Sequence, residues 1–441
     1  MLHCDTLIAP RWCAPVAPAN RLLSDHGVIV NDGRIADILP IPEARLKYQP
    51  SVFVERPEHL LIPGFVNAHT HAAMTLMRGL ADDMPLATWL RKGIWPAEKQ
   101  WVGAEMVRDG TELAIAEMIS GGTTCFSDQY YFPEIVAETA VDLHMRVMVG
   151  TPIIESPTAW ANTIDEYLNK ASDLVHDPYA DHPLVSTCFA PHTVNALSDE
   201  SFVALRVLAD QLDVRIQMHL HETAMEVEQA LKKDGQRPIA RLQKLGLVNT
   251  SLLAVHAVHL ADVEIELFAE SGVHVAHCPK SNLKLASGIA PIAKYGRAGI
   301  NVAIGTDGAA SNNCLDMLEE MRMTALLAKA RESDAAAVSA GEALRMATLG
   351  GAEALGLAHE TGSIEAGKWA DLACVDLNHL HSQPLYDPIS QLVYTARAEQ
   401  VSDVWVAGRH QLDKGRLTQI DTVSLLARCN EWRDRFASAT K

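Results

Sequence analysis

Through the middle of the chain, eight apolar runs with the character of β-strands alternate with helical segments, and this alternation restricts the possible folds most strongly. Between the runs, apolar residues recur every three or four positions, for example over 104–120 and 199–212, as in helices that cover a sheet. Eight strand–helix units predict an α/β fold, a (β/α)8 TIM barrel, whose chemistry gathers at the carboxyl ends of its strands. The expected strands span 61–69, 123–128, 146–153, 184–192, 215–221, 252–259, 273–277 and 301–307.

A doubly wound parallel sheet is the competing architecture. Such a sheet brings its functional residues to one crevice, at the point where the strand order reverses. In this chain, histidine or acidic residues end strands throughout the series rather than at one place. The distribution of these residues therefore favours the barrel.

The two ends of the chain differ from the middle in their sequence pattern, which is typical of short strands joined by turns. The sequence Asn31-Asp32-Gly33 separates two short apolar runs, which is typical of a β-hairpin. Segments 367–376 and 401–409 show similar alternation near the other end. We expect residues 1–58 and 368–441 to form one composite β-sandwich domain, which flanks a catalytic barrel domain at 59–367.

Charge and composition restrict the class of partner. Lysine and arginine number 37 and aspartate and glutamate 55, so the formal net charge is −18. This balance disfavours nucleic acids and anionic membranes as partners, because both require a basic face, and it suits a neutral or cationic small molecule. The chain starts without the pattern of a secretory signal, and its eight cysteines lack C-x-x-C spacing. We expect a cytoplasmic homo-oligomer with reduced thiols.

Two histidines, His69 and His71, stand two residues apart at the end of the first expected strand. Residues i and i+2 of a strand point to the same face, so both imidazoles would enter one small volume, as two ligands of one metal ion must. Taken alone, such a pair more often consists of ordinary hydrogen-bonded histidines than of metal ligands. The other strand ends decide between these readings.

Further strand ends carry the groups that a metal-dependent hydrolase needs. His219 is a candidate third ligand, and Glu222, three residues later, is a candidate proton shuttle. Asp307 ends the last strand between glycines, where a carboxylate can bind a metal with one oxygen and accept a proton with the other. His256 is suited to orient a water molecule, and His192 to donate to a substrate. Each residue alone is more often structural, but five such strand ends in one barrel favour a single site.

These segments resemble the amidohydrolase superfamily and, within it, the chlorohydrolase/aminohydrolase branch. The closest resemblance is to the 5-methylthioadenosine/S-adenosylhomocysteine deaminases, and it extends from about residue 5 to residue 415. The motifs are specific for the branch and less so for the substrate. They are PGFVNAHTH at 63–71, HLHE at 219–222, HCPKSN at 277–282 and GTDG at 305–308.

The resemblance implies a role for each matching residue. It implies metal binding by His69, His71, His219 and Asp307, and proton transfer by Glu222 together with Asp307. Both carboxylates would also contact the substrate.

The resemblance further implies that His256 positions the attacking water, that Glu98 binds the ribose hydroxyls and that His192 contacts the nucleoside. Without the family match, Glu98 reads equally well as a solvated residue at a helix start.

Two departures from the family pattern are informative. Binuclear members have a lysine at the end of strand four, but residues 188–192 contain none, so one divalent metal is expected, most simply Zn²⁺, with Fe²⁺ as the alternative. Some members bind the far end of the substrate with arginines between strands three and four. Here no arginine occurs between Arg146 and Arg206.

The predicted function is hydrolytic deamination of an adenine nucleoside (5-methylthioadenosine, S-adenosylhomocysteine or adenosine) to the inosine analogue and ammonia, by a metal-activated water. The alternatives are a deaminase or dechlorinase of guanine, cytosine or s-triazine rings and, least favoured, a non-catalytic barrel scaffold. Residues 79–90 contain Met, Leu and Trp side chains that could line an apolar pocket, although ordinary packing explains them equally well.

Overall fold

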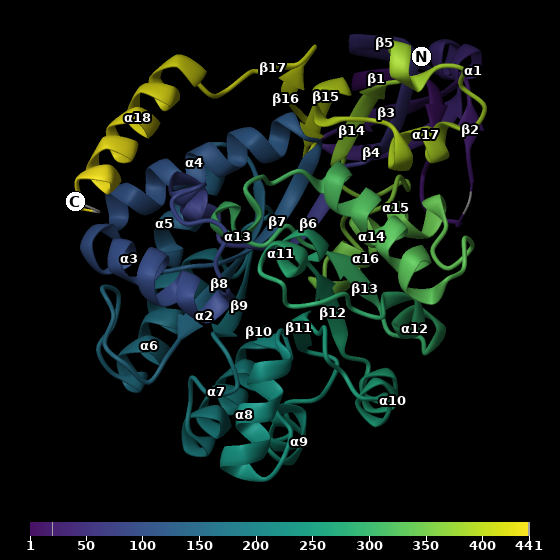
Figure 1. The fold of residues 1–441 in the computed structure, drawn as a ribbon. Helices are drawn as coiled ribbons and strands as arrows, with labels where there is room; N and C mark the ends of the chain where they lie inside the picture. The colour runs from purple at the N-terminus through teal and green to yellow at the C-terminus, as the bar shows by residue number, and fades with distance from the viewer. Residues whose placement is uncertain (20, 440–441) are drawn as a thin grey trace.

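The computed structural model describes residues 1–19 and 21–439 and contains a barrel with a second sheet beside it (Figure 1). Eight parallel strands form the barrel, and each pairs with its neighbour in sequence. The predicted TIM barrel is therefore confirmed. Its strands are β6 (Phe65–Thr70), β7 (Thr123–Gln129), β8 (Arg146–Ile153), β9 (Val185–Pro191), β10 (Arg215–Leu220), β11 (Leu252–His256), β12 (His274–His277) and β13 (Val302–Ile304).

The first and last barrel strands start or end differently from the prediction. The apolar run before Pro63 belongs to β5 (Tyr48–Pro63), which lies in the second sheet, and β6 begins only after Gly64. A Cβ atom at Gly64 would lie 2.1 Å from Thr124 Cγ2, so the chain can pass β7 this closely only with glycine. At the other end, β13 stops at Ile304 because the next residues turn toward β6.

Hydrogen bonds between β6 and the segment after β13 close the barrel. The amide of Asp307 donates to the carbonyl of His69 at 3.0 Å. Two residues before His69 on β6, Asn67 Oδ1 accepts from the amide of Thr306 at 2.9 Å, and Asn67 Nδ2 donates to Thr306 Oγ1 at 2.8 Å. The closing contact thus places Asp307 directly beside His69.

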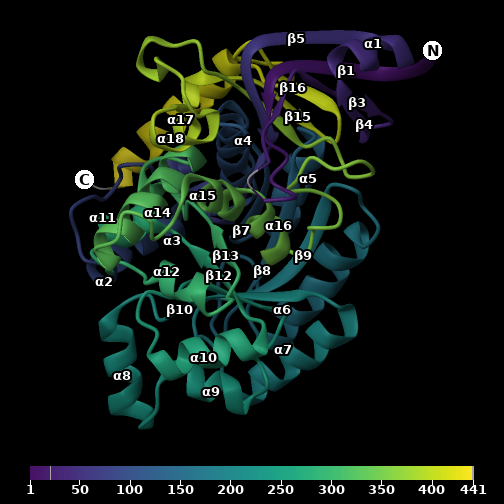
Figure 2. The ribbon, with the colours of Figure 1, turned by 90° about the vertical axis from the view of Figure 1, so that its right-hand side faces the viewer.

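Helices surround the barrel and lie on its outer face (Figures 1 and 2). Side-chain caps start several of them: Ser198 Oγ accepts from the amide of Ser201, and Thr223 Oγ1 from the amide of Glu226, both at 3.2 Å. The helices are α4 (Ala104–Ser120), α5 (Pro133–Asp142), α6 (Ile164–Lys170), α7 (Asp199–Leu212), α8 (Ala224–Asp234), α9 (Pro238–Lys244), α10 (Asp262–Ser271), α11 (Pro279–Lys284), α12 (Ile292–Arg297), α13 (Ala309–Asn312), α14 (Met317–Glu332), α15 (Ala340–Ala347) and α16 (Leu349–Ala354).

The connection from β6 to α4 is built of short helices and forms one wall of the active-site cavity described below. An ion pair of 2.5 Å between Lys284 Nζ and Asp82 Oδ1 ties this connection to α11. The short helices are η1 (Ala72–Met77), α2 (Leu86–Trp89), η2 (Leu90–Ile94) and α3 (Trp95–Trp101). Short helices η3 (Ala171–His176) and η4 (Asp177–Tyr179) extend α6.

Strands from both ends of the chain pair in one nine-stranded mixed sheet, in the order β17-β16-β15-β14-β5-β1-β3-β4, with β2 paired to β1. Side chains from both ends share its core, among them Ile8, Val28, Cys374 and Trp405. The predicted domain boundaries at 58/59 and 367/368 stay a prediction. Strand β5 runs through the first of these boundaries. The remaining strands are β1 (Leu2–Cys13), β2 (Leu23–Ser24), β3 (His26–Asn31), β4 (Arg34–Pro40), β14 (Leu372–Asp376), β15 (Val401–Val406), β16 (Arg409–Asp413) and β17 (Arg416–Leu417).

The last helix returns to the barrel, where Trp432 Nε1 donates to Asp109 Oδ2 of α4 at 2.8 Å. None of the helices in the described part of the chain is both long and apolar enough to cross a membrane. The helices associated with the mixed sheet and the chain end are α1 (Ile41–Lys47), η5 (Leu380–Ser382), α17 (Pro388–Tyr394), η6 (Ala398–Gln400) and α18 (Thr422–Ala439).

Candidate metal centre and active-site cavity

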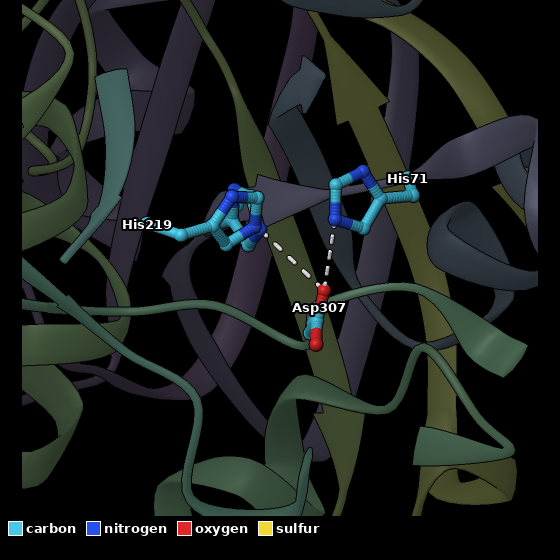
Figure 3. Close-up of side chains that lie close together, drawn as sticks. His71, His219 and Asp307 are labelled. Atoms are coloured by element: carbon cyan, nitrogen blue, oxygen red, sulfur yellow. Dashed lines mark hydrogen bonds and ion pairs between the residues drawn. The ribbon is translucent and has the colours of Figure 1, made fainter. Parts of the chain in front are cut away.

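Three histidines and one aspartate converge at the carboxyl ends of the barrel strands. His69 lies on β6, His71 directly follows it, His219 lies on β10, and Asp307 follows β13. One ligand atom from each of these residues lies within 4.8 Å of the others. Figure 3 shows the rings of His71 and His219 on either side of the Asp307 carboxylate. The sequence predicted this set.

The distances within this cluster would allow all four residues to hold one shared metal ion. His69 Nε2 lies 3.2 Å from His219 Nε2 and 3.4 Å from Asp307 Oδ1, and His71 Nε2 lies 3.2 Å from the same oxygen. Two atoms that each bind the same zinc ion at about 2.0–2.2 Å can be no more than about 4.4 Å apart, and the three separations above lie within that limit. Two imidazole nitrogens that face each other so closely would repel through their lone pairs unless a proton or a cation lies between them. The donor set and its spacing therefore fit a zinc ion.

Backbone carbonyls orient two of the imidazoles. His71 Nδ1 donates to the carbonyl of Gln129 at 2.6 Å, and His219 Nδ1 to the carbonyl of His192 at 2.9 Å. A ring that donates through Nδ1 presents the lone pair of Nε2, which is the form that binds a metal. His69 is fully buried, and its Nδ1 has no partner among the described residues.

The protonation preferences of the metal-free cluster reflect burial and the central carboxylate. Burial lowers the pKa of His69 to about 4 and that of His219 well below its usual value, so both rings are neutral. Burial acts in the same direction on His71, but Asp307 outweighs it and raises the pKa of His71 to about 9. Although burial alone would raise it, the pKa of Asp307 lies well below its usual range because His69 and His71 donate to it. The cluster is thus a strong site for positive charge.

Two serines hold the second oxygen of the aspartate. Asp307 Oδ2 accepts from Ser281 Oγ at 2.6 Å and from Ser311 Oγ at 2.7 Å, which leaves Oδ1 facing the histidines. A Cβ atom at Gly305 would lie 2.8 Å from the amide nitrogen of His69, so glycine is required for the close approach that delivers Asp307. Sequence reasoning assigned no role to the serines, although Ser281 lies in the quoted segment 277–282.

A cavity of about 720 Å³ opens above the cluster, and every other residue predicted for the site lines it. Glu222 follows β10 and is largely buried, with Oε2 3.9 Å from His256 Nε2. Burial raises the pKa of Glu222, which favours a protonated carboxyl group that can donate. His256 Nδ1 lies 2.8 Å from Asn282 Oδ1, a contact that fixes the imidazole plane.

The residues predicted to contact a nucleoside line the same cavity. Glu98, on α3, accepts from the hydroxyl of Tyr130 at 2.9 Å, and burial raises the pKa of its carboxyl group. The ring of His192 faces the cavity with its centroid 5.0 Å from that of His219. The structure thus brings both residues to the cavity, and their contacts with a substrate stay a prediction.

The segment at 79–90 contributes part of the cavity wall. Leu86, Trp89 and Leu90 line the cavity, whereas Met84 packs against the hydrophobic core instead. The prediction of an apolar lining from this segment is correct for Leu86, Leu90 and Trp89 and wrong for Met84 and Leu80, which also packs against the core.

His221 does not share a face with His219, because β10 ends at Leu220 and does not continue. The backbone of His221 has a φ of 52°, and its side chain points toward Glu264, whose Oε2 lies 3.6 Å from Nδ1. The rings of His219 and His221 would face the same way only if the strand continued through His221, and it does not.

Glu226 is a cavity residue that sequence reasoning missed. Its Oε2 accepts from the amide of Glu222 at 2.9 Å and its Oε1 from the amide of His221 at 3.2 Å. Burial raises the pKa of Glu226 to about 7. The carboxyl group of Glu226 holds the backbone from which Glu222 projects. The spacing of four residues between Glu222 and Glu226 is the sequence signal that could have indicated this contact.

Comparison with known proteins shows the family. A family model described as the amidohydrolase family matches residues 60–410. A 5-methylthioadenosine/S-adenosylhomocysteine deaminase from Teredinibacter turnerae is 45% identical over 434 residues, which cover 98% of each chain.

Solved structures also share the fold over nearly the whole chain. An adenosine deaminase from Xanthomonas campestris with bound zinc is 51% identical, with a TM-score of 0.98 over 99% of each chain. An atrazine chlorohydrolase from Arthrobacter aurescens in complex with zinc is 26% identical, with a TM-score of 0.90 over 97% of this chain and 99% of the other. From the match to residues 60–410 and from this full-length similarity, the chain belongs to the amidohydrolase family.

Proposed function

We propose that this chain is a zinc-dependent deaminase that converts an adenine nucleoside and water into the inosine analogue and ammonia. The observation that carries the proposal is the cluster of His69, His71, His219 and Asp307 at the base of a cavity that also contains a buried carboxylic acid. The relatives whose names state adenine nucleosides as substrates, at 45% and 51% identity, support the choice of substrate.

The bound ion supplies Lewis acidity, which makes a water molecule a nucleophile near neutral pH. Asp307 accepts a proton from the attacking water, since its Oδ1 faces the cluster and its Oδ2 is held by serines. His256, fixed by Asn282, orients the same water.

Glu222 acts as the general acid in this proposal. Its raised pKa favours the protonated form, from which it donates to the ring nitrogen next to C6 as water adds there. The proton taken up at Asp307 goes to the departing amine, and the proton of the added hydroxyl returns to Glu222 as the C6 carbonyl forms. One water is thus consumed, one ammonia is released, and both carboxyl groups return to their starting state. Glu98 and His192 are proposed to hold the ribose.

Deamination or dechlorination of another nitrogen heterocycle is the second candidate, favoured by the similarity to an atrazine chlorohydrolase. Purified protein with its metal content measured should be offered adenosine, 5-methylthioadenosine, guanine, cytosine and atrazine. We expect the adenine nucleosides to release ammonia, and we expect their ultraviolet absorbance to change from that of adenine to that of hypoxanthine. Release of ammonia or chloride only from the other rings would overturn the proposal.

We also propose a cytoplasmic location and a homo-oligomeric state. All eight cysteines in the described part of the chain are unpaired thiols, which suits a reducing compartment. Disulfide-linked species in protein isolated without a reductant would argue against this location, and size-exclusion chromatography with light scattering tests the assembly.

A further inference from the structure

We infer that the cavity selects adenine nucleosides whose 5′ substituent carries no carboxylate, so that short neutral substituents are preferred over a homocysteine-type substituent. This inference rests on the proposed function, because the orientation of the substrate follows from the catalytic groups. It narrows that function to one class of nucleoside.

The proposed catalytic contacts orient the substrate along the cavity. The amine-bearing carbon must lie beside Asp307 and Glu222, and the ribose is assigned to Glu98 and His192. The 5′ carbon therefore points away from the metal cluster, toward the solvent-exposed end of the cavity.

The side chains at that exposed end are neutral. Trp95 and Met225 line the cavity and are each 49% exposed. Gln229, on the same helix as Met225, and Asn195, in the segment after β9, also line it and are exposed. Deeper, Trp89 and Ile94 are buried and add apolar surface. Aromatic and thioether surfaces of this kind favour a methylthio group, which has no charge to hydrate.

Apart from histidines, the charged side chains in the described cavity lining are carboxylic acids. Within the described residues, no lysine or arginine lines it, whereas it contains the carboxyl groups of Glu98, Glu222, Glu226 and Asp307. A carboxylate on the substrate would lose part of its hydration and meet no cation in return.

Two arginines on neighbouring elements bind other groups of the chain. The guanidinium of Arg241 binds Asp199 Oδ1 at 2.7 Å and the carbonyls of Val194 and Leu197. Arg91 is exposed on η2, and its Nε donates to the carbonyl of Ala87 at 3.0 Å. Neither is part of the cavity lining.

A matched pair of substrates separates charge from length. We would compare kcat/KM for 5′-butylthioadenosine and 5′-(3-carboxypropylthio)adenosine, with 5-methylthioadenosine and S-adenosylhomocysteine as natural counterparts. We expect the carboxylate analogue to fall at least about tenfold below the butyl analogue, the ratio that about 1.4 kcal/mol produces. Likewise, S-adenosylhomocysteine should fall at least about tenfold below 5-methylthioadenosine.

The outcomes distinguish this inference from the function on which it rests. Equal kcat/KM for the butyl and carboxypropyl analogues would overturn the inference and leave the deaminase intact. Absence of ammonia from every adenine nucleoside, with zinc bound, would instead refute the proposed function.

Adding a cation at the exposed end gives an independent test. Asn195→Arg should raise the ratio of kcat/KM for the carboxylate analogue to that for the butyl analogue, and the gain should diminish at high salt. Asn195→Met, similar in length but uncharged, is the control and should leave the ratio unchanged. Met225→Arg repeats the test from α8 if the first variant does not fold. An unchanged ratio in a folded arginine variant counts against the inference.

Discussion

Within the described residues, histidine and aspartate side chains form two clusters, and the clusters differ in what neutralises their negative charge. At the barrel end, His69, His71 and His219 surround Asp307. In the mixed sheet, Asp403, His410 and Asp413 also lie within 4.8 Å of one another.

An arginine occupies the second cluster. Arg56 Nη2 lies 2.5 Å from Asp403 Oδ1 and 3.6 Å from Asp413 Oδ1, and His410 Nε2 lies 3.1 Å from the same Asp403 oxygen. The side chain of Asp403 is fully buried, so the guanidinium supplies the charge that it needs. The barrel cluster has no such side chain, and the described cavity above it contains no lysine or arginine. The same residue types therefore make a structural ion pair in one place and a metal site in the other.

The largest effect expected from this comparison is the loss of the metal. His219→Ala removes one of three imidazoles and should abolish both stoichiometric zinc and deamination. His410→Ala, the matched change in the mixed sheet, should leave the zinc content at one per chain. Elemental analysis of both purified variants measures this. Full zinc in the first variant, or its loss in the second, would contradict the assignment.

The next effect separates catalysis from metal binding. Glu222→Gln should retain zinc, because Glu222 is not in the metal cluster, and should lower kcat by about 10²–10⁴-fold through loss of the acid. Glu319→Gln, on α14 outside the cavity, is the control and should be close to wild type. A Glu222→Gln variant with wild-type kcat would remove the proton-transfer role.

Removing the arginine of the second cluster should affect stability and not catalysis. Arg56→Met leaves Asp403 buried without its cation, and breaking such a pair costs about 3–5 kcal/mol of the free energy of unfolding. Denaturant unfolding measures the loss, and kcat per bound zinc should stay at the wild-type value. If the variant is as stable as wild type, the arginine does not neutralise Asp403.

The smallest expected effect is a change in stability at low pH. Although burial opposes it, hydrogen bonds from His410, Arg56 and Ser402 hold the pKa of Asp403 well below its usual range. A carboxyl group with a depressed folded pKa stabilises the protein above its unfolded pKa, about 3.9, and this contribution is lost as the pH falls below that value. The stability difference between wild type and Arg56→Met should therefore narrow below about pH 4. A difference that widens there would have the wrong sign.

Local patterns in the sequence predicted the barrel and the pair His69 and His71 because those features have short periods, whereas His219 and Asp307 were predicted as ligands from their places at strand ends and from the family resemblance. Alternating strands and helices repeat along the chain, and His69 and His71 are fixed by the two-residue period of one strand. The ending of β10 before His221 was not predictable, since it depends on a backbone turn with a φ of 52° within the folded protein.

Contacts between distant segments had no local signal. Arg56 and Asp403 are 347 positions apart, and Ser281 and Asp307 meet only because β12 and β13 are neighbours in the barrel. The role of Glu226 likewise depends on the fold, because its carboxyl group, in the first turn of α8, accepts from the amide of Glu222. Ser281 and Glu226 support the site, and their roles became visible only with the fold.

The most direct test of the account is a crystal structure of the purified protein with anomalous scattering recorded at the zinc edge. We predict one strong peak per chain, at about 2.0–2.2 Å from His69 Nε2, His71 Nε2, His219 Nε2 and Asp307 Oδ1. No peak between these atoms in protein that deaminates adenosine, or a peak at Asp403 and His410 instead, would contradict the central claim.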